Sequence, residues 1–129
     1  MGRARIYTLE RNCIFMKVIP FYPCADLNEV KKIYMDVLGL SLYKDQGACL
    51  IFEVEDGHGI GFCTHMEALA KPSTLFITFV VDDVRAMELK LKDAGLECIR
   101  ETGINERFNI EQALFRDPNG YTLEIQRFL

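Results

Sequence analysis

The sequence predicts an α+β protein of two βαβββ units, which form a curved mixed sheet with the helices on its convex face. Two observations support this fold class. A strand–helix–strand pattern occurs twice along the chain, and each predicted helix lies between an aspartate and a glycine. Asp26 and Asp83 are suited to the N-cap positions, while Gly39 and Gly95 are suited to the positions that end the helices.

The first unit is predicted over residues 17–66. It opens on residues 18–24, an apolar segment that Pro20 and Pro23 mark as an edge strand, because proline cannot donate a ladder hydrogen bond. A helix follows over residues 27–38, whose apolar side chains recur on one helical face. Three short strands complete the unit at residues 40–43, 48–54 and 60–65, with an Asp56-Gly57 turn between the last two.

The second unit is predicted over residues 74–129. A strand at residues 75–81 is followed by a helix at 84–94, and a further strand begins at 96–100. The last two strands, 112–116 and 121–128, flank the tight-turn sequence Asp117-Pro118-Asn119-Gly120. Gly120 matches Gly57 when the two units are superposed, so the chain is interpreted as an internal repeat. Loops at residues 67–74 and 102–110 are expected beside the concave face.

Alternation along the strands divides the predicted sheet into two faces. Ile77, Phe79 and Val81 point to one side with Leu123 and Ile125, and this uniformly apolar side is expected to carry the helices. The opposite side is mixed in polarity and is expected to line a concavity; it carries Phe76, Thr78, Val80, Thr122, Glu124 and Gln126.

Composition and charge argue against nucleic-acid and membrane partners. The net charge is -4 and basic residues lie beside acidic ones, so the sequence offers no cationic patch for nucleic acid. No apolar run approaches the ~20 residues of a membrane-spanning helix. Residues 1–15 precede Met16 as an N-terminal extension without the features of a secretory signal, and residues 16–129 form a single domain.

The five cysteines stand at positions 13, 24, 49, 63 and 98 and form no CxxC pair. An odd number without close spacing favours reduced thiols over a disulfide framework. We therefore expect a cytoplasmic protein.

Three motifs together resemble the glyoxalase/bleomycin-resistance (vicinal oxygen chelate) superfamily. They are Asp26-Leu27 followed by Tyr34 and Val37-Leu38-Gly39-Leu40, then Val81-Asp82-Asp83-Val84, and finally Asp117-Pro118-Asn119-Gly120-Tyr121-Thr122-Leu123-Glu124-Ile125. The resemblance extends from Lys17 to the end of the sequence. Residues 20–26 are similar to the opening strand of the bleomycin-resistance-like branch in particular.

The resemblance implies four positions at which metal-dependent members of that superfamily hold a divalent cation. They correspond here to Ile19, Phe76, Glu124 and, through the internal repeat, Gly61, although a slip of one residue would place Phe62 there. Only Glu124 can donate a lone pair, and one carboxylate does not make a transition-metal site. The sequence therefore predicts no bound metal and no cofactor.

The mixed face is predicted to bind a small molecule in an aromatic pocket. The predicted ligand-binding residues are Ile19, Phe21, Gly61, Cys63, His65, Phe76, Thr78, Phe115 and Glu124. The leading interpretation is a metal-independent binding protein of this superfamily.

Two alternatives remain open at this point. One is a lyase, isomerase or dioxygenase-type enzyme, which would use Glu124 as a catalytic base or a displaced metal site made of Cys63, His65 and Glu124. The other is an interaction module whose aromatic side chains close an interface. A homodimer is expected in either case, because family members commonly dimerise and the proline-rich first strand leaves an open edge.

Overall fold

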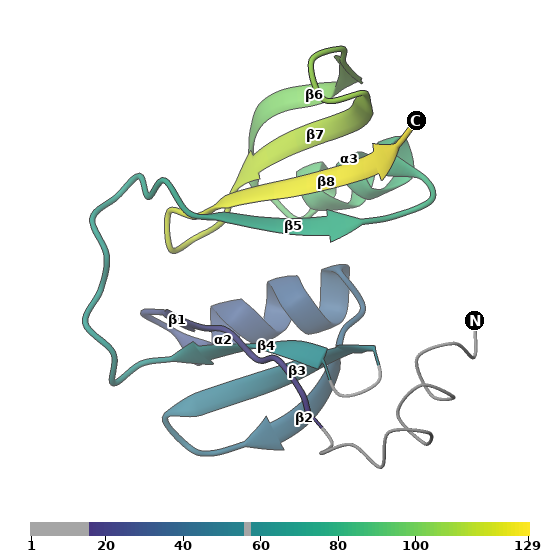
Figure 1. The fold of residues 1–129 in the computed structure, drawn as a ribbon. Helices are drawn as coiled ribbons and strands as arrows, with labels where there is room; N and C mark the ends of the chain where they lie inside the picture. The colour runs from purple at the N-terminus through teal and green to yellow at the C-terminus, as the bar shows by residue number, and fades with distance from the viewer. Residues whose placement is uncertain (1–15, 56–57) are drawn as a thin grey trace, which may run out of the picture.

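The computed structural model describes residues 16–55 and 58–129 (Figure 1). The predicted N-terminal extension, residues 1–15, and the predicted Asp56-Gly57 turn lie outside the described residues. The first unit contains β1 (Phe21–Pro23), α2 (Leu27–Val30), η1 (Lys31–Val37), β2 (Ser41–Asp45), β3 (Cys49–Glu55) and β4 (His58–Cys63). The second contains β5 (Phe76–Val80), α3 (Val84–Asp93), β6 (Glu97–Asn105), β7 (Ile110–Arg116) and β8 (Thr122–Phe128).

The strands form two four-stranded mixed sheets with the same internal order. The first runs β1-β4-β3-β2 and the second runs β5-β8-β7-β6. In each sheet the first strand pairs in parallel with the last, and the other neighbours are antiparallel. This common order confirms the predicted α+β fold of two βαβββ units, with the strands divided between two hydrogen-bonded sheets.

The predicted helix boundaries agree with the structure. Asp26 accepts a hydrogen bond from the Asn28 backbone N–H at 2.8 Å, and Asp83 accepts one from the Ala86 backbone N–H at 3.0 Å. Gly39 and Gly95 follow the helices with φ of +82° and +88°, a conformation that glycine adopts without steric cost. The first helix differs from expectation in that its α-helical turn α2 continues as the π-helical segment η1.

The strand boundaries differ most from the sequence prediction in β1 and β6. β1 covers only Phe21–Pro23, within the predicted 18–24. β6 extends to Asn105, so the first part of the loop expected at 102–110 is strand. The cause is continued pairing with β7, in which Gly103 lies opposite Gln112 and Asn105 lies opposite Ile110. Antiparallel pairing satisfies backbone groups that a loop would leave to solvent.

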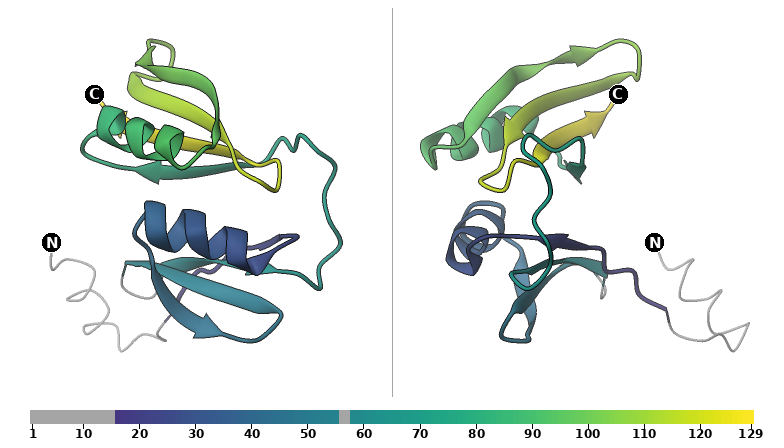
Figure 2. Two further views of the ribbon diagram at one scale, coloured as in Figure 1. Left: turned by 180° about the vertical axis from the view of Figure 1, so that it is seen from behind. Right: turned by 90° about the vertical axis from the view of Figure 1, so that its left-hand side faces the viewer.

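Both helices cover the same side of the sheets, as Figure 2 shows in the view from behind. The apolar face predicted for the second unit lies on this side, with Ile77, Leu123 and Ile125 all buried in the core. Tyr34 connects the two units, because its hydroxyl donates to Asp117 at 3.0 Å and its ring lies 6.3 Å from that of Phe79. Among the described residues, no helix has both the length and the apolar character needed to cross a membrane.

The turn that connects β7 to β8 also ties the units together. One carboxylate oxygen of Asp117 accepts the backbone N–H groups of Asn119 and Tyr121, each at 2.9 Å. The Tyr121 hydroxyl donates to the carbonyl of Pro23, and the Asn119 side chain accepts the backbone N–H of Ala25 at 3.0 Å. Burial raises the pKa of Asp117 above its ordinary value. This motif therefore has a structural role in joining β1 to the second sheet.

Candidate functional site

Glu124 lies in the middle of β8, on the face of the second sheet opposite α3. Its side chain is 8% exposed, and Thr78 of β5 and Leu114 of β7 are its neighbours across the sheet. One carboxylate oxygen accepts the Thr78 hydroxyl at 2.7 Å and the Gln126 amide at 3.5 Å, while the other accepts the Gln112 amide at 2.5 Å. Three strands therefore fix the position of one nearly buried carboxylate.

A second layer of hydrogen bonding orients the Gln112 side chain. Its amide oxygen accepts the Asn105 side-chain N–H at 2.9 Å, so its amide nitrogen is directed to Glu124. A carboxylate accepts hydrogen bonds and a side-chain amide donates them, so each link pairs complementary groups. The network runs from β6 through β7 to β8 and fixes Glu124 before any ligand arrives.

Above this network is an open hollow of about 550 Å³, here called the Glu124 hollow. Its lining consists of Phe76, Arg100, Asn105, Phe108, Ile110, Gln112, Leu114, Glu124, Gln126 and Phe128. Three of its aromatic side chains are largely exposed, with 53% exposure for Phe76, 62% for Phe108 and 66% for Phe128. Most small-molecule sites have this combination of apolar walls and a few fixed polar groups.

The four positions implied for a metal do not fit a cation. Strand pairing places Gly61 opposite Phe21, as Glu124 lies opposite Thr78, so Gly61 and not Phe62 is the counterpart of Glu124. Phe62 is fully buried in the core. The side chains at Ile19, Gly61 and Phe76 have no lone pair to offer a cation, and the single carboxylate of Glu124 does not make a transition-metal site.

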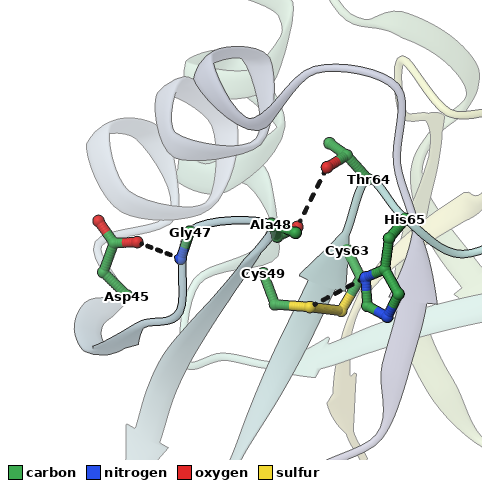
Figure 3. The surroundings of a disulfide bond; sticks show 7 residues. All are labelled: Asp45, Gly47, Ala48, Cys49, Cys63, Thr64 and His65. Atoms are coloured by element: carbon green, nitrogen blue, oxygen red, sulfur yellow. Dashed lines mark hydrogen bonds between the residues drawn. A yellow bond between two sulfur atoms is a disulfide. The ribbon is translucent and has the colours of Figure 1, made fainter.

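The corresponding face of the first sheet is filled by its own side chains. A Cβ atom added to Gly61 would come within 2.4 Å of the Phe21 ring, so this ring covers the glycine. Next to it, Cys49 and Cys63 form a disulfide between β3 and β4 (Figure 3). The expectation that all cysteines are reduced thiols is wrong for this pair; the two cysteines are cross-strand neighbours, a relation that spacing in the sequence does not reveal.

His65 lies two residues beyond β4 and is exposed, although the sequence prediction included it in the strand. Its Nδ1 atom is 3.6 Å from the Cys49 sulfur (Figure 3). Cys63 and His65 therefore group with Cys49 in the first sheet. The displaced metal site expected from Cys63, His65 and Glu124 does not form, because Glu124 lies on β8 of the second sheet and is not part of this group.

Phe115 requires a correction. It was expected on the mixed face, but it is fully buried in the hydrophobic core. Strand pairing explains the difference, because Leu114 lies opposite Glu124 while Phe115 lies opposite Leu123. A shift of one residue in a strand exchanges its two faces, and the register of this strand was not fixed by the sequence. Leu114 takes the place in the lining that was expected for Phe115.

The sequence prediction did not include several residues that line the Glu124 hollow. Asn105 and Phe108 fall where a loop was expected, and Gln112 was read only as the start of a strand. Alternation along the strand indicates that Gln112 and Leu114 share a face. The register of β7 against β8 then places both side chains on the face of Glu124. Ile19 and Phe21 belong to the first unit, and neither contributes to the lining of the Glu124 hollow.

Comparison with known proteins gives one family. A model described as the Glyoxalase/Bleomycin resistance protein/Dioxygenase superfamily matches residues 18–125. A relative, "Glyoxylase I 4" of Arabidopsis thaliana, is 26% identical in an alignment of 119 positions that covers 79% of this chain and 64% of that protein. The chain thus spans slightly less than two thirds of that relative's length.

Solved structures with the same fold are less similar in sequence. The hypothetical protein SA1046 from S. aureus superposes with a TM-score of 0.73 at 15% identity, covering 92% of this chain and 98% of that chain. The fosfomycin resistance protein FosX from Mesorhizobium loti superposes with a TM-score of 0.71 at 18% identity, covering 91% of this chain and 95% of that chain. At these identities the likeness concerns the fold.

Proposed function

Since the chain belongs to the Glyoxalase/Bleomycin resistance protein/Dioxygenase superfamily, we propose that it binds a small molecule in the Glu124 hollow without a metal. The observation that carries this proposal is the environment of Glu124. A carboxylate that is 8% exposed and held by three side-chain donors forms the floor of a hollow with aromatic walls. Such a group is positioned for recognition by the fold itself.

The chemistry of the lining indicates the class of ligand. Phe76, Phe108 and Phe128 offer flat apolar surfaces, which favour a planar or hydrophobic body. Glu124 accepts hydrogen bonds and cannot donate them when ionised, so the ligand would present a hydroxyl or amine toward it. The ligand class is therefore an aromatic or hydrophobic molecule with one hydrogen-bond-donating group.

A thermal-shift screen of the folded chain against such molecules tests this function. A ligand at 100 times its Kd stabilises the native state by about 2.7 kcal/mol, which gives a measurable rise in Tm. The variant Glu124→Gln has the same shape but no charge. It should bind the best ligand roughly 10-fold to 100-fold more weakly, since a hydrogen bond to a charged group contributes about 1.5–3 kcal/mol.

Glu97→Gln is the matched control, because Glu97 makes the same exchange at an exposed position on β6 outside the hollow. It should bind the ligand as the unmodified chain does. The proposal fails if no molecule of this class raises Tm, or if Glu124→Gln and Glu97→Gln respond alike.

An enzyme that uses Glu124 as a general base is the second candidate, and the same buried, oriented carboxylate favours it. Turnover and ligand binding of the Glu124→Gln variant distinguish an enzyme from a binding protein. Loss of turnover with folding intact would identify a catalytic base, whereas weaker binding without any turnover in the unmodified chain would identify a binding protein. A variant with unchanged turnover would reject the catalytic role of Glu124.

We include a homodimer in this proposal. Val80 is 57% exposed on the same face as Phe76, so the hollow and its surroundings present apolar area that a second copy could cover. Solution mass at several concentrations, compared for the unmodified chain and Val80→Ser, distinguishes a dimer through this face from a monomer. An interaction module without a ligand would dimerise there and fail every ligand screen.

The proposed compartment is the cytoplasm. There the Cys49–Cys63 disulfide would meet a pool of reducing thiols.

A further inference from the structure

A second group of reactive side chains lies in the first sheet, apart from the Glu124 hollow. The ligand atoms of Cys49, Cys63 and His65 all lie within 4.8 Å of one another (Figure 3). Among the described residues, this is the only group of three or more His, Cys, Asp or Glu side chains placed to share a cation. Cysteine sulfur and histidine nitrogen are the two ligand types that zinc prefers in proteins.

The sheet keeps the two sulfurs together whether or not they are bonded. Cys49 lies directly opposite Cys63 in the antiparallel pair β3–β4, with a Cα–Cα distance of 4.1 Å. The pairing continues past them, because the backbone N–H of Thr64 donates to the carbonyl of Ala48 at 2.9 Å. The Thr64 hydroxyl donates to the same carbonyl at 3.2 Å. These backbone contacts do not depend on the sulfur–sulfur bond, so two reduced thiols would remain adjacent.

We propose that reduction of the Cys49–Cys63 disulfide opens a three-ligand site for zinc or a similar soft divalent cation, with His65 as third ligand. Two molecules of a thiol reductant supply two electrons and two protons, so that the S–S bond breaks, two cysteine thiols form and the reductant becomes its own disulfide. On binding Zn²⁺ the two thiols release two protons, and neutral His65 donates the lone pair of Nδ1. Oxidation by a disulfide reverses both steps and releases the cation.

Charge and burial favour this assignment. The side chains of Cys49 and Cys63 are 7% and 2% exposed, and an isolated thiolate pair would be costly there. Two thiolates with one Zn²⁺ are neutral overall, so the cation compensates the charges that it creates. His65 is exposed, so it would bind the cation from the solvent side. Zinc usually takes four ligands, so a fourth position remains for water or another ligand.

This site is independent of the proposed function. It lies in the sheet that contains β3 and β4, whereas Glu124 lies on β8 of the second sheet. None of its three residues lines the Glu124 hollow. Loss of one site should therefore leave the other intact.

The test uses Co²⁺ as a spectroscopic substitute for Zn²⁺, with the tag-free full chain. One sample is reduced with excess dithiol and desalted without oxygen, and the other is kept oxidised. The reduced chain should bind one Co²⁺ per molecule with a thiolate-to-cobalt charge-transfer band in the near ultraviolet, and Zn²⁺ should bleach this band. The oxidised chain should show no such band, because a disulfide has no thiolate to donate.

Variants identify the ligands. Cys63→Ser should remove the charge-transfer band, and far-ultraviolet circular dichroism reports whether it folds. His65→Ala changes an exposed side chain and leaves both thiols in place. It should weaken Co²⁺ binding by about 10-fold or more, at least as much as loss of an outer-shell partner weakens a metal site.

Cys98→Ser is the matched control, because Cys98 is a free cysteine outside the cluster. This variant should bind Co²⁺ as the unmodified chain does, and so should Glu124→Gln. The proposal is overturned if the reduced chain gives no thiolate band, if His65→Ala binds as tightly as the unmodified chain, or if a control variant loses the band.

Discussion

The two sheets carry different chemistry at equivalent positions. In the second sheet Thr78 and Glu124 form a parallel cross-strand pair beneath an open hollow. In the first sheet the same pair is Phe21 and Gly61, and the phenylalanine ring covers the glycine. The neighbouring cross-strand pair is Gln112 with Gln126 in one sheet and Cys49 with Cys63 in the other. The positions that orient a carboxylate in one unit thus form a disulfide in the other.

This difference shows that the repeat determines where side chains project but not what they do. Backbone pairing gives each unit the same array of positions on the face away from the helix. One unit fills the central position with an aromatic ring, and the other fills it with a buried acid and its hydrogen-bond donors. Function must therefore be argued for each face separately, since a common fold does not carry it.

The largest effect is expected from Phe115, and it tests the register on which the comparison depends. Phe115→Ala should lower the free energy of unfolding by about 3–5 kcal/mol, because Phe115 is fully buried in the core. Leu114→Ala removes a partly exposed side chain and should cost under about 2 kcal/mol. Urea unfolding measures both. A larger cost for Leu114→Ala would mean that the two faces of β7 have been assigned the wrong way round.

A smaller effect is expected from Glu88, which has no counterpart in the first unit. Glu88 is buried in α3, accepts the backbone N–H of Thr102 at 2.9 Å and pairs with Lys92 at 2.8 Å. The equivalent residue in the first helix is the exposed Lys31. Burial alone would raise the pKa of Glu88, but its bonds to Lys92 and Thr102 outweigh burial and lower it to about 2.

Because the folded pKa of Glu88 is depressed, its stabilisation is complete above the unfolded value of about 4.3 and is lost as the pH falls toward 2. Glu88→Gln should cost about 1.5–3 kcal/mol at neutral pH and should flatten this acid limb of the stability curve. Urea unfolding at a series of pH values measures it. Glu101→Gln, which changes the exposed partner of Lys92, is the control and should keep the acid limb; equal loss in both variants would contradict a specific role for Glu88.

The smallest net effect is expected from copying the disulfide into the second sheet. Gln112→Cys with Gln126→Cys, in a background of Cys49→Ser and Cys63→Ser, places two cysteines at the equivalent cross-strand pair with the same separation along the chain. A loop of this length gains about 3 kcal/mol from a cross-link, and loss of the Gln112 bond to Glu124 offsets about 1–3 kcal/mol. Intact mass should show the cross-link, and Tm of oxidised against reduced protein should show its stabilisation. Failure to cross-link would show that the two pairs are not equivalent.

The sequence by itself determined the repeat. Asp26 and Asp83 cap their helices, Gly39 and Gly95 end them in the left-handed conformation, and Asp117 with Gly120 forms the last turn. These features depend on local backbone conformation, which a few neighbouring residues decide. Alternation along β5 and β8 also placed Glu124 and Thr78 on one face correctly, because the side-chain period of a strand is fixed.

Only the tertiary structure decided which residues meet across strands. The register of β7 sent Phe115 to the core and Leu114 to the hollow, the extension of β6 brought Asn105 to Gln112, and the pairing of β3 with β4 joined Cys49 to Cys63. Each of these contacts depends on how far one strand slides against the next, and the free energy that fixes this sliding comes from packing and pairing over the whole sheet. A strand shows its period in its own residues, whereas its partners are set by the rest of the fold.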